Sequence, residues 1–429
     1  MTVMTGATEC YVYMVLPGAT EFTTVGRFAI DSERDPLPQG HFVYCRSYLD
    51  NPDAVPIDPI CLNKLSDRIY RTTKHNGLFS SLLDSKPDRW ARRAITRMVR
   101  KKSLDKPGEI DLLLLAPDDR AGALGFGCSP VPPAPNQKFK SFNELAEISS
   151  IIDAIDAREG FPQVLSAEEF EALNAILTSL GGKRPKAIVE DAEGLWISKF
   201  NRKHDDWNHA RIEHAILELA SACGITAVRS RVVTVAGKDV LLVKRFDREK
   251  TARGYLRSRM ISGQTVLRAE GTVMRPQRWS YALLAEEIRR FGAQPDADST
   301  ELFRRMVFNA LIFKDDDGPS NHAMISKRAG WKLSPAYDLI PSLKPIGLKR
   351  YEHAMSCGIF GRIASVRNML TECGRFLLGE EEATTIINSM EEFVNKNWHK
   401  FARCAGVTES DCRKISGIIA SSGFRHISK

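Results

Sequence analysis

The chain has 429 residues, a length that predicts two or three compact domains at about 100–200 residues each. Hydrophobic residues make up 43% of it and charged residues 27%, an ordinary globular mixture that excludes collagen-like and fully disordered chains. The 61 Lys and Arg residues against 53 Asp and Glu give a net charge of +8. This mild excess permits contact with nucleic acid, ATP or an acidic partner, and selects none of them.

The sequence also bears on the compartment. No run approaches the roughly 18 consecutive apolar residues that span a bilayer, and no basic segment precedes the first apolar stretch, so we expect neither a membrane span nor a secretory signal. The nine cysteines form no CxxC pair, which favours reduced thiols over a disulfide framework or a zinc cluster. We therefore expect a cytoplasmic protein.

Residues 1–127 have the pattern of a mixed α/β subdomain. Strands are predicted at 10–16 and 42–48, and a helix at 89–102, where apolar residues recur at near-helical spacing. Residues 128–140 carry four prolines, which predicts an extended linker.

Residues 141–280 combine helices with strands, and residues 281–429 are mainly helical. In the middle region we predict helices at 142–157, 166–179 and 209–222, paired strands at 187–189 and 195–200, and a hairpin at 231–246. One further hairpin is predicted at 324–333, within the helical last third. A strand-rich middle before a helical end is the order of a two-lobed kinase.

Three adjacent carboxylates, Asp315, Asp316 and Asp317, follow a helix predicted to end near Phe313. Negative charge at a helix C-terminus is unfavourable by about 0.3–1 kcal/mol per group, and a divalent cation would offset it. An isolated run of three aspartates is more often a solvated acidic loop, so both interpretations stay open at this point.

The residues after this run favour a cation site. Asn321 lies five residues beyond Asp316, the Asp-to-Asn interval of the protein-kinase catalytic loop, and Asp338 follows a predicted strand. Phosphoryl transfer needs a carboxylate to orient or deprotonate the attacking hydroxyl, and an amide with a carboxylate to hold Mg²⁺. Asp316, Asn321 and Asp338 have these chemical types.

Upstream residues could supply the phosphate contacts. Lys199 lies in a predicted strand, whose alternation aims it away from Trp196 and Ser198, and Glu213 on the next helix could pair with it. A solvent-facing lysine and a surface ion pair elsewhere are the open alternatives. Gly181 and Gly182 lie in a basic turn that ends at Lys186, whose backbone could approach phosphate closely; an ordinary β-turn is the alternative.

Seven segments together give the sequence its resemblance to a known family. They are residues 87–90, 119–124, 179–186, 243–248, 308–312, 321–323 and 333–339. With these segments the chain resembles the HipA family, the serine/threonine kinase toxins of bacterial toxin–antitoxin modules. The resemblance covers nearly the whole chain and is most specific at 333–339.

The resemblance implies a role for each candidate residue. Asp316 resembles the catalytic base, Asn321 and Asp338 resemble the Mg²⁺ ligands, and Lys199 resembles the lysine that clamps the phosphates of ATP. The family's phosphate-binding loop corresponds to the turn with Gly181, Gly182 and Lys186, and its adenine-holding hinge to residues 243–246, with Lys244 and the adjoining Phe246. Ser179 stands where the family has an autophosphorylated serine that switches the kinase off. A phosphoserine there would have basic partners close by.

The sequence departs from the family pattern in the loop that follows Asp316. Gly318 replaces a usual His, Ser320 replaces a frequent basic residue, and Lys314 stands where an Asn is usual. Pro319 stiffens the loop. The metal ligands remain, and the changes bear on the rate of the reaction.

The resemblance implies a protein-kinase-like α+β fold with two lobes, an extra N-terminal α/β subdomain and a C-terminal lobe that is all-helical apart from the hairpin. It also implies ATP and Mg²⁺ as cofactors, a helix-turn-helix antitoxin similar to HipB as partner, and a protein substrate such as an aminoacyl-tRNA synthetase. DNA would be reached mainly through the antitoxin, and no membrane is implied.

Two other functions remain open. A catalytically silent relative would bind ATP or an antitoxin–DNA complex without phosphoryl transfer, and the altered loop favours it. A nucleic-acid-binding protein would use the seven basic residues within 89–102 as a phosphate-contacting face, although a solvated helix is the simpler interpretation of that segment.

Overall fold

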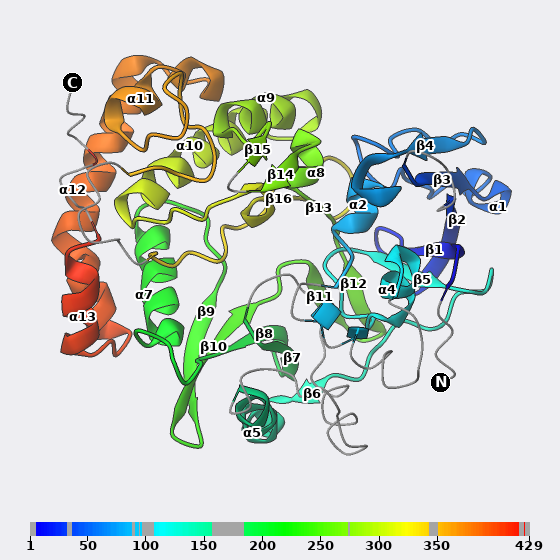
Figure 1. Ribbon diagram of the computed structural model, residues 1–429, viewed down its shortest axis with the longest axis horizontal. Helices are drawn as coiled ribbons and strands as arrows, with labels where there is room; N and C mark the ends of the chain where they lie inside the picture. Colours follow the sequence, from blue (N-terminus) through cyan, green and yellow to red (C-terminus); the bar gives the residue numbers. More distant parts are fainter. Residues whose placement is uncertain are drawn as a thin grey trace.

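In the computed structural model, an N-terminal sheet is followed by a second sheet, which lies beside a mainly helical C-terminal part (Figure 1). The structure describes residues 6–31, 37–87, 91–93, 95–96, 107–156, 184–272, 275–342, 351–419 and 424. The predicted helix at 166–179 lies outside the described residues. Of the predicted helix at 89–102, only 91–93 and 95–96 are described, and they are helical.

The N-terminal subdomain, residues 6–127, is built on a five-stranded antiparallel sheet with strand order β4-β3-β2-β1-β5. Its strands are β1 (Glu9–Val15), β2 (Phe22–Asp31), β3 (Gln39–Tyr44), β4 (Tyr70–Thr72) and β5 (Leu124–Gly127). Its helices are α1 (Arg46–Leu49), η1 (Lys74–Asn76), α2 (Ser80–Leu83) and α4 (Glu109–Leu115). The strand predicted at 10–16 is confirmed as β1. The strand predicted at 42–48 is wrong beyond Tyr44, because the chain turns there into α1.

The second sheet has strand order β6-β7-β8-β10-β9, and only its β6–β7 pair is parallel. Its strands are β6 (Lys140–Ser141), β7 (Lys186–Asp191), β8 (Gly194–Phe200), β9 (Ser230–Val235) and β10 (Lys238–Lys244). One face carries η2 (Phe142–Glu144) and α5 (Leu145–Asp156), and the other faces α7 (His209–Ala222). The predicted strand pair, hairpin and helix at 209–222 are confirmed. Residues 128–139, with four prolines, are irregular as predicted.

Short elements link the second sheet to the helical part. They are β11 (Arg248–Thr251), β12 (Gly254–Arg257), β13 (Arg259–Ser262), α8 (Gly263–Leu267), β14 (Glu270–Thr272) and β15 (Arg275–Gln277). The predicted hairpin at 324–333 is confirmed as β16 (Ala323–Ser326) and β17 (Lys332–Leu333), and β13 joins it as a third strand.

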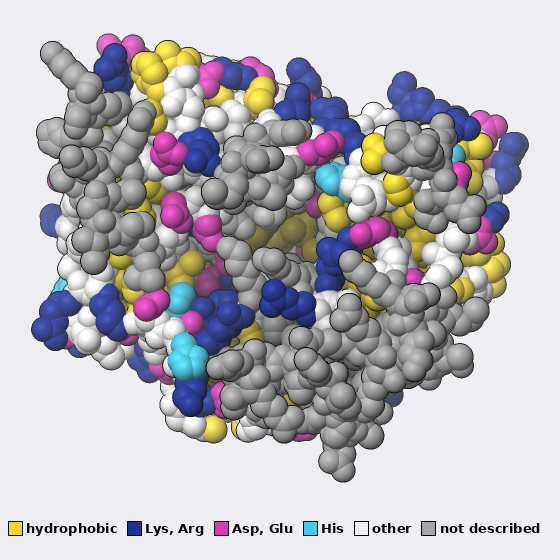
Figure 2. Space-filling view, in the orientation of Figure 1, with side chains coloured by type: hydrophobic (Ala, Val, Ile, Leu, Met, Phe, Trp, Pro, Cys, Tyr) yellow, Lys and Arg dark blue, Asp and Glu magenta, His cyan; other side chains and the backbone are white. Residues whose placement is uncertain are grey.

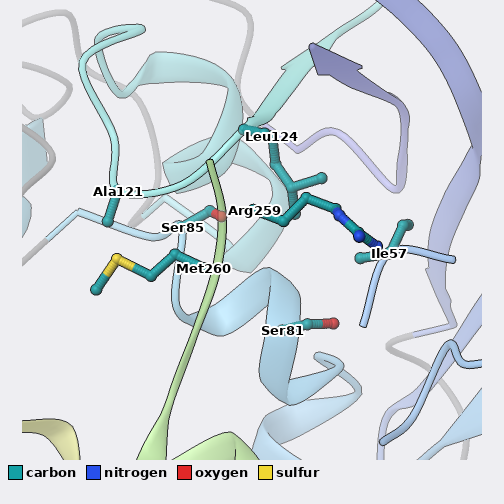
Figure 3. A pocket seen from close by; sticks show the side chains of 8 residues that line it. Ile57, Ser81, Ser85, Ala121, Leu124, Arg259 and Met260 are labelled. Atoms are coloured by element: carbon teal, nitrogen blue, oxygen red, sulfur yellow. The ribbon is translucent and has the colours of Figure 1, made fainter. Parts of the chain in front are cut away.

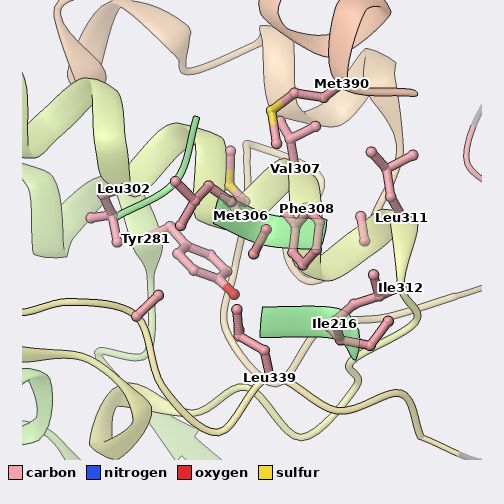
Figure 4. Close-up of a cluster of buried hydrophobic side chains, with 14 of the residues drawn as sticks. Ile216, Tyr281, Leu302, Met306, Val307, Phe308, Leu311, Ile312, Leu339 and Met390 are labelled. Atoms are coloured by element: carbon pink, nitrogen blue, oxygen red, sulfur yellow. The ribbon is translucent and has the colours of Figure 1, made fainter. Parts of the chain in front are cut away.

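The helical part is organised around one large apolar core. Its helices are α9 (Tyr281–Phe291), α10 (Pro295–Leu311), η3 (Pro319–Asn321), α11 (Val366–Leu370), η4 (Cys373–Phe376), α12 (Glu380–Cys404) and α13 (Glu409–Ser416). Figure 4 shows Met306 and Phe308 of α10 among Ile216 of α7 and Met390 of α12. Each buried side chain of this kind contributes about 1.5–3 kcal/mol to folding. This core therefore fixes α7, which also covers the second sheet, onto the helical part.

Nine cysteines, all within the described ranges, are free thiols. Among the residues that the structure describes, no helix is both long enough and apolar enough to cross a membrane.

A buried ionic junction joins the N-terminal subdomain to the segment after β10. Asp247 accepts hydrogen bonds from Arg245 (2.8 Å), Arg248 (2.7 Å) and the backbone N–H of Gly122 (2.9 Å). Both guanidinium groups also donate to the Arg120 carbonyl, at 2.9 and 2.7 Å. All three charged side chains are buried. The two arginines hold the pKa of Asp247 far below its usual range despite burial.

A smaller contact between the same two parts of the chain lies close to this junction. Arg259 of β13 donates to the Pro56 carbonyl at 2.9 Å. Figure 3 shows the Arg259 side chain extending toward Ile57, with Leu124, Ser81 and other side chains of the subdomain around a small cavity. The subdomain is thus held to the rest of the chain by polar contacts as well as by apolar packing.

Replacing Asp247 should destabilise the fold severely. Asp247→Ala leaves the Arg245 and Arg248 guanidinium groups buried without their shared carboxylate, and breaking a buried ion pair in this way costs about 3–5 kcal/mol. Urea unfolding followed by circular dichroism measures the loss. The control is Glu249→Ala, which removes the exposed Glu249–Lys327 pair and should change the free energy of unfolding by less than about 1 kcal/mol. Equal effects of the two changes would contradict the junction's importance.

Asp84, just after α2, makes another polar contact between the N-terminal subdomain and the rest of the chain, at the start of α8. Its carboxylate accepts from the Ser262 backbone N–H at 2.7 Å, the Ser262 hydroxyl at 2.6 Å and the Thr265 hydroxyl at 2.8 Å. Burial raises the pKa of Asp84 to about 6, although these hydrogen bonds oppose the shift. The contact of Asp84 with Ser262 and Thr265 therefore contains a carboxylate whose pKa lies above the ordinary Asp range.

This raised pKa predicts a pH dependence of stability. The native state binds a proton at Asp84 below about pH 6, whereas the unfolded chain binds it only below about pH 4. The contribution of Asp84 to stability is therefore present below pH 4 and is lost as pH rises through 6. Asp84→Asn removes this component, so the variant should gain stability relative to wild type between pH 4 and 6. Urea unfolding across pH 4–8 measures the difference, and a pH-independent difference would contradict the prediction.

Candidate active site

Four segments that are distant in sequence meet between the second sheet and the helical part. They are β8 with Lys199, α7 with Glu213, the loop between α10 and β16, and the residues after β17 with Asp338. On the face shown in Figure 2, Lys, Arg, Asp and Glu side chains lie around the hollowed middle of the molecule.

Lys199 is the centre of this site. Its Nζ lies 2.6 Å from Glu213 Oε1 and 3.0 Å from Asp338 Oδ1. Strand alternation places Lys199 opposite Leu241 on the α7 side, while Trp196 packs with α5 on the other face. The predicted direction of Lys199 and its pairing with Glu213 are confirmed, and the solvent-facing alternative is wrong, since only 15% of the Lys199 side chain is exposed.

The charges in this group depend on one another. Burial disfavours the ammonium of Lys199, but the Glu213 and Asp338 carboxylates outweigh it and raise the pKa of Lys199. Burial raises the pKa of Glu213 against the opposing effect of Lys199. Lys199 holds the pKa of Asp338 far below its usual range, and burial only partly opposes this. At neutral pH, Lys199 and Asp338 are therefore an ion pair.

The loop after α10 begins with a turn that directs a lysine inward. Phe313 has a φ of 57°, the left-handed region that a non-glycine residue rarely adopts, and its ring stacks on Tyr351. The next residue, Lys314, has a fully buried side chain whose Nζ lies 2.9 Å from Asp316 Oδ1 and 3.9 Å from Asp338 Oδ2. Burial opposes the charge of Lys314, yet Asp338 and Asp316 raise its pKa.

Two of the three consecutive aspartates, Asp316 and Asp317, have different environments. Asp317 is buried and bonds His322 at 2.7 Å and the Tyr281 hydroxyl. Burial opposes its charge, but His322 holds the pKa of Asp317 well below the usual range. Asp316 is bonded by Lys314 and has 47% of its side chain exposed. Asp317 therefore anchors the loop, whereas Asp316 is exposed to solvent.

Asn321 and Asp338 offer the oxygen ligands that Mg²⁺ prefers. Asn321 ends η3 with its side chain half-buried. The two loops are tied together where the Tyr337 hydroxyl donates to the Ser320 carbonyl at 2.9 Å. Asp338 has a φ of 57° and 45% of its side chain exposed, with Oδ1 bonded to Lys199. The Asn321 amide and the half-exposed Asp338 carboxylate are thus groups of the type that suits a divalent cation.

The structure places the other candidate residues unequally. Lys186 lies directly opposite Lys199 on β7, is buried, and helps to lower the pKa of Asp338. Phe246 stacks on Tyr337, with 5.9 Å between ring centroids, and so lies beside Asp338. Ser179, Gly181 and Gly182 lie outside the described residues.

Lys244 lies elsewhere. It is opposite Trp196, on the α5 face of the sheet, with its Nζ over the Trp196 ring and bonded to the Glu193 carbonyl. Its side chain therefore points away from Lys199. Only its backbone can contribute to a hinge next to Phe246.

The loop between α10 and β16 is supported by α8, a contact that the sequence does not indicate. The Gly263 N–H at the start of α8 donates to the His322 carbonyl at 2.7 Å, and a Cβ at Gly263 would lie 2.6 Å from the Pro319 carbonyl oxygen. A Cβ at Gly318 would lie 3.1 Å from the Trp279 ring. The Gly263 sequence context carries no signal for this approach, because α8 and the loop are far apart in the chain.

Lys199 on the second sheet is bonded to Glu213 on α7, and the loops of the helical part carry the acidic residues. This arrangement belongs to a protein-kinase-like α+β fold. The family model described as the HipA-like C-terminal domain matches residues 178–398, slightly more than half of the chain. The chain belongs to this family, which confirms the resemblance seen in the sequence.

Two known proteins extend the comparison. A protein of Sinorhizobium fredii (strain NBRC 101917 / NGR234) named "Putative kinase Y4mE" is 25% identical over 348 residues, which cover 75% of this chain and 77% of that protein. HipA of Shewanella oneidensis MR-1, solved with HipB and operator DNA, is 15% identical with a TM-score of 0.68, over 95% of this chain and 94% of that chain. The second likeness establishes the shared fold over nearly the full length.

The close approach at Gly263 predicts a specific sensitivity. Gly263→Ala places a methyl group against the Pro319 carbonyl, so the loop must shift, and overpacking of this kind costs about 1–3 kcal/mol. Urea unfolding measures the loss of stability. Gly417→Ala is the matched control, since nothing lies within 4 Å of its added Cβ, and it should leave stability within about 0.5 kcal/mol of wild type. An unchanged Gly263→Ala protein would show that the loop is not held by α8.

Proposed function

We propose that this chain is an ATP- and Mg²⁺-dependent protein serine/threonine kinase and the toxin of a toxin–antitoxin module. The observation that carries the proposal is the cluster of Lys199, Glu213 and Asp338, with bonds of 2.6 and 3.0 Å. Family membership and the kinase name of the Sinorhizobium relative support it.

The geometry supports a division of roles between the two loops and the sheet. Lys199, which is bonded to Asp338, would clamp the phosphates of ATP. The neighbouring Lys186 adds positive charge on the same face of the sheet. Asn321 and Asp338 would hold the Mg²⁺, which neutralises charge on the phosphates. Phe246 and the backbone of Lys244 would form the adenine side of the site.

The reaction would proceed at the exposed carboxylate of Asp316. This group accepts the proton of a Ser or Thr hydroxyl as the hydroxyl oxygen bonds to the γ-phosphorus. The bond from the γ-phosphorus to the bridging oxygen breaks, and ADP leaves. Asp317, bonded to His322 and Tyr281, keeps the backbone of Asp316 in place during the step.

Partners and regulation are part of the same proposal. A helix-turn-helix antitoxin similar to HipB would bind the chain, and DNA would be reached through it; the Shewanella HipA structure contains HipB and operator DNA. The protein substrate would be a translation-related protein such as an aminoacyl-tRNA synthetase. Autophosphorylation of Ser179 would switch the kinase off.

One contact favours a second candidate, a catalytically silent module that binds ATP or an antitoxin–DNA complex. The Lys314 ammonium is 2.9 Å from Asp316 Oδ1, so one oxygen of this carboxylate is already bonded to the chain itself. The two candidates differ in phosphoryl transfer and not in nucleotide binding.

Transfer of labelled phosphate from ATP in the presence of Mg²⁺ distinguishes them. Wild type should label itself and a protein substrate, with Ser179 identified by mass spectrometry. Asp316→Asn removes the proton acceptor and should lower the rate by about 10²–10⁴-fold, and Asp338→Asn should lower both transfer and metal-dependent ATP binding. Glu249→Gln, which changes an exposed carboxylate on β11, is the control with unchanged activity. A wild-type chain that binds ATP and transfers no phosphate would overturn the kinase and leave the silent module.

A further inference from the structure

Lys314 is an unusual residue for the centre of a nucleotide site. Its side chain has no exposed surface, although lysine is among the residues least often fully buried. Burying an ammonium is unfavourable unless carboxylates surround it. The carboxylates that do so here are Asp316, with Oδ1 at 2.9 Å, and Asp338, with Oδ2 at 3.9 Å.

Together with Lys199, this lysine completes a line of alternating charge through the site. Glu213 is bonded to Lys199, Lys199 to Asp338 Oδ1, Asp338 Oδ2 faces Lys314, and Lys314 is bonded to Asp316. Each of the two carboxylate oxygens of Asp338 therefore lies beside a lysine of the chain. Asp316 and Asp338 are joined by Lys314 instead of by an external ion.

This arrangement limits how many divalent ions the site can hold. A cation that bridges two carboxylates occupies the space and uses the oxygens that a second divalent ion would need. A divalent ion placed there as well would lie within a few ångströms of the buried ammonium and be repelled by it in a weakly screened environment. The half-exposed side of Asp338 and the Asn321 amide remain for one ion.

We propose that Lys314 is a built-in cation that takes the place of a second divalent ion, so that the site holds a single divalent ion together with the nucleotide. The inference rests on the proposed function, since it concerns the ions that accompany ATP. Lys314 is a positioning residue here, because it acts on Asp316 and Asp338 and does not exchange a proton with substrate.

The position of Lys314 in the chain supports this assignment. The left-handed turn at Phe313 and the bond from the Lys314 N–H to the Asn309 carbonyl at 2.8 Å direct the side chain inward. The backbone is thus committed to this orientation, independently of the ammonium. A smaller neutral side chain at residue 314 would leave Asp316 and Asp338 facing each other across an unfilled space.

Counting bound metal tests the proposal directly. Mn²⁺ is the probe, and electron paramagnetic resonance of free Mn²⁺ gives the number bound per chain in the presence of a non-hydrolysable ATP analogue. Wild type should bind one Mn²⁺ with the nucleotide. Lys314→Met and Lys314→Asn should bind two, because the carboxylates of Asp316 and Asp338 become available to a second ion. Lys327→Met, which removes an exposed lysine on the β16–β17 turn, should bind one.

The outcomes separate this inference from the function on which it rests. Two Mn²⁺ per wild-type chain, or one in folded Lys314→Met and Lys314→Asn, would overturn the role of Lys314 while leaving the kinase intact. If neither variant folds, the wild-type count decides alone. A wild-type chain that binds no nucleotide would overturn the proposed function and this inference with it.

Discussion

The ion pair between Lys199 and Asp338 is the contact on which the site depends, because it joins the second sheet to the helical part. Lys199 is carried by β8, and Asp338 follows β17 in a left-handed conformation that costs about 1–3 kcal/mol. The apolar core around α7 and α10 holds α7 in place, and Glu213 of α7 is bonded to Lys199. The same packing that stabilises the fold thus positions the charges.

The N-terminal subdomain depends on a second set of buried charges next to this site. Arg245, Asp247 and Arg248 follow β10 directly and lie on both sides of Phe246 in the chain. Any motion of the subdomain relative to the rest of the chain must therefore act on the segment that carries Phe246. The buried contacts around Asp247 thus connect the subdomain with the segment that packs on Tyr337.

Much of this architecture could be predicted from the sequence, because it follows from periodicity. The strand of Lys199, the helix of Glu213 and the hairpin before Asp338 were predicted from alternation and helical spacing, and family resemblance indicated their roles. The position of Lys244 could not be predicted in this way, because its face of the sheet depends on its pairing opposite Trp196. The support of the loop by Gly263 was missed for a related reason, since it joins segments far apart in the chain.

The run of three aspartates shows most clearly what periodicity leaves out. Asp315, Asp316 and Asp317 are chemically identical in sequence, and only the five-residue interval to Asn321 separated them. In the structure, Asp317 is buried and bonded to His322, whereas Asp316 is half-exposed and bonded to Lys314, so these two carboxylates differ in burial and in partner. A buried lysine two residues before Asp316 changes the charge around Asp316 and Asp338 without changing either carboxylate. The chemistry of the site therefore depends on Lys314 as much as on the residues that match the family pattern.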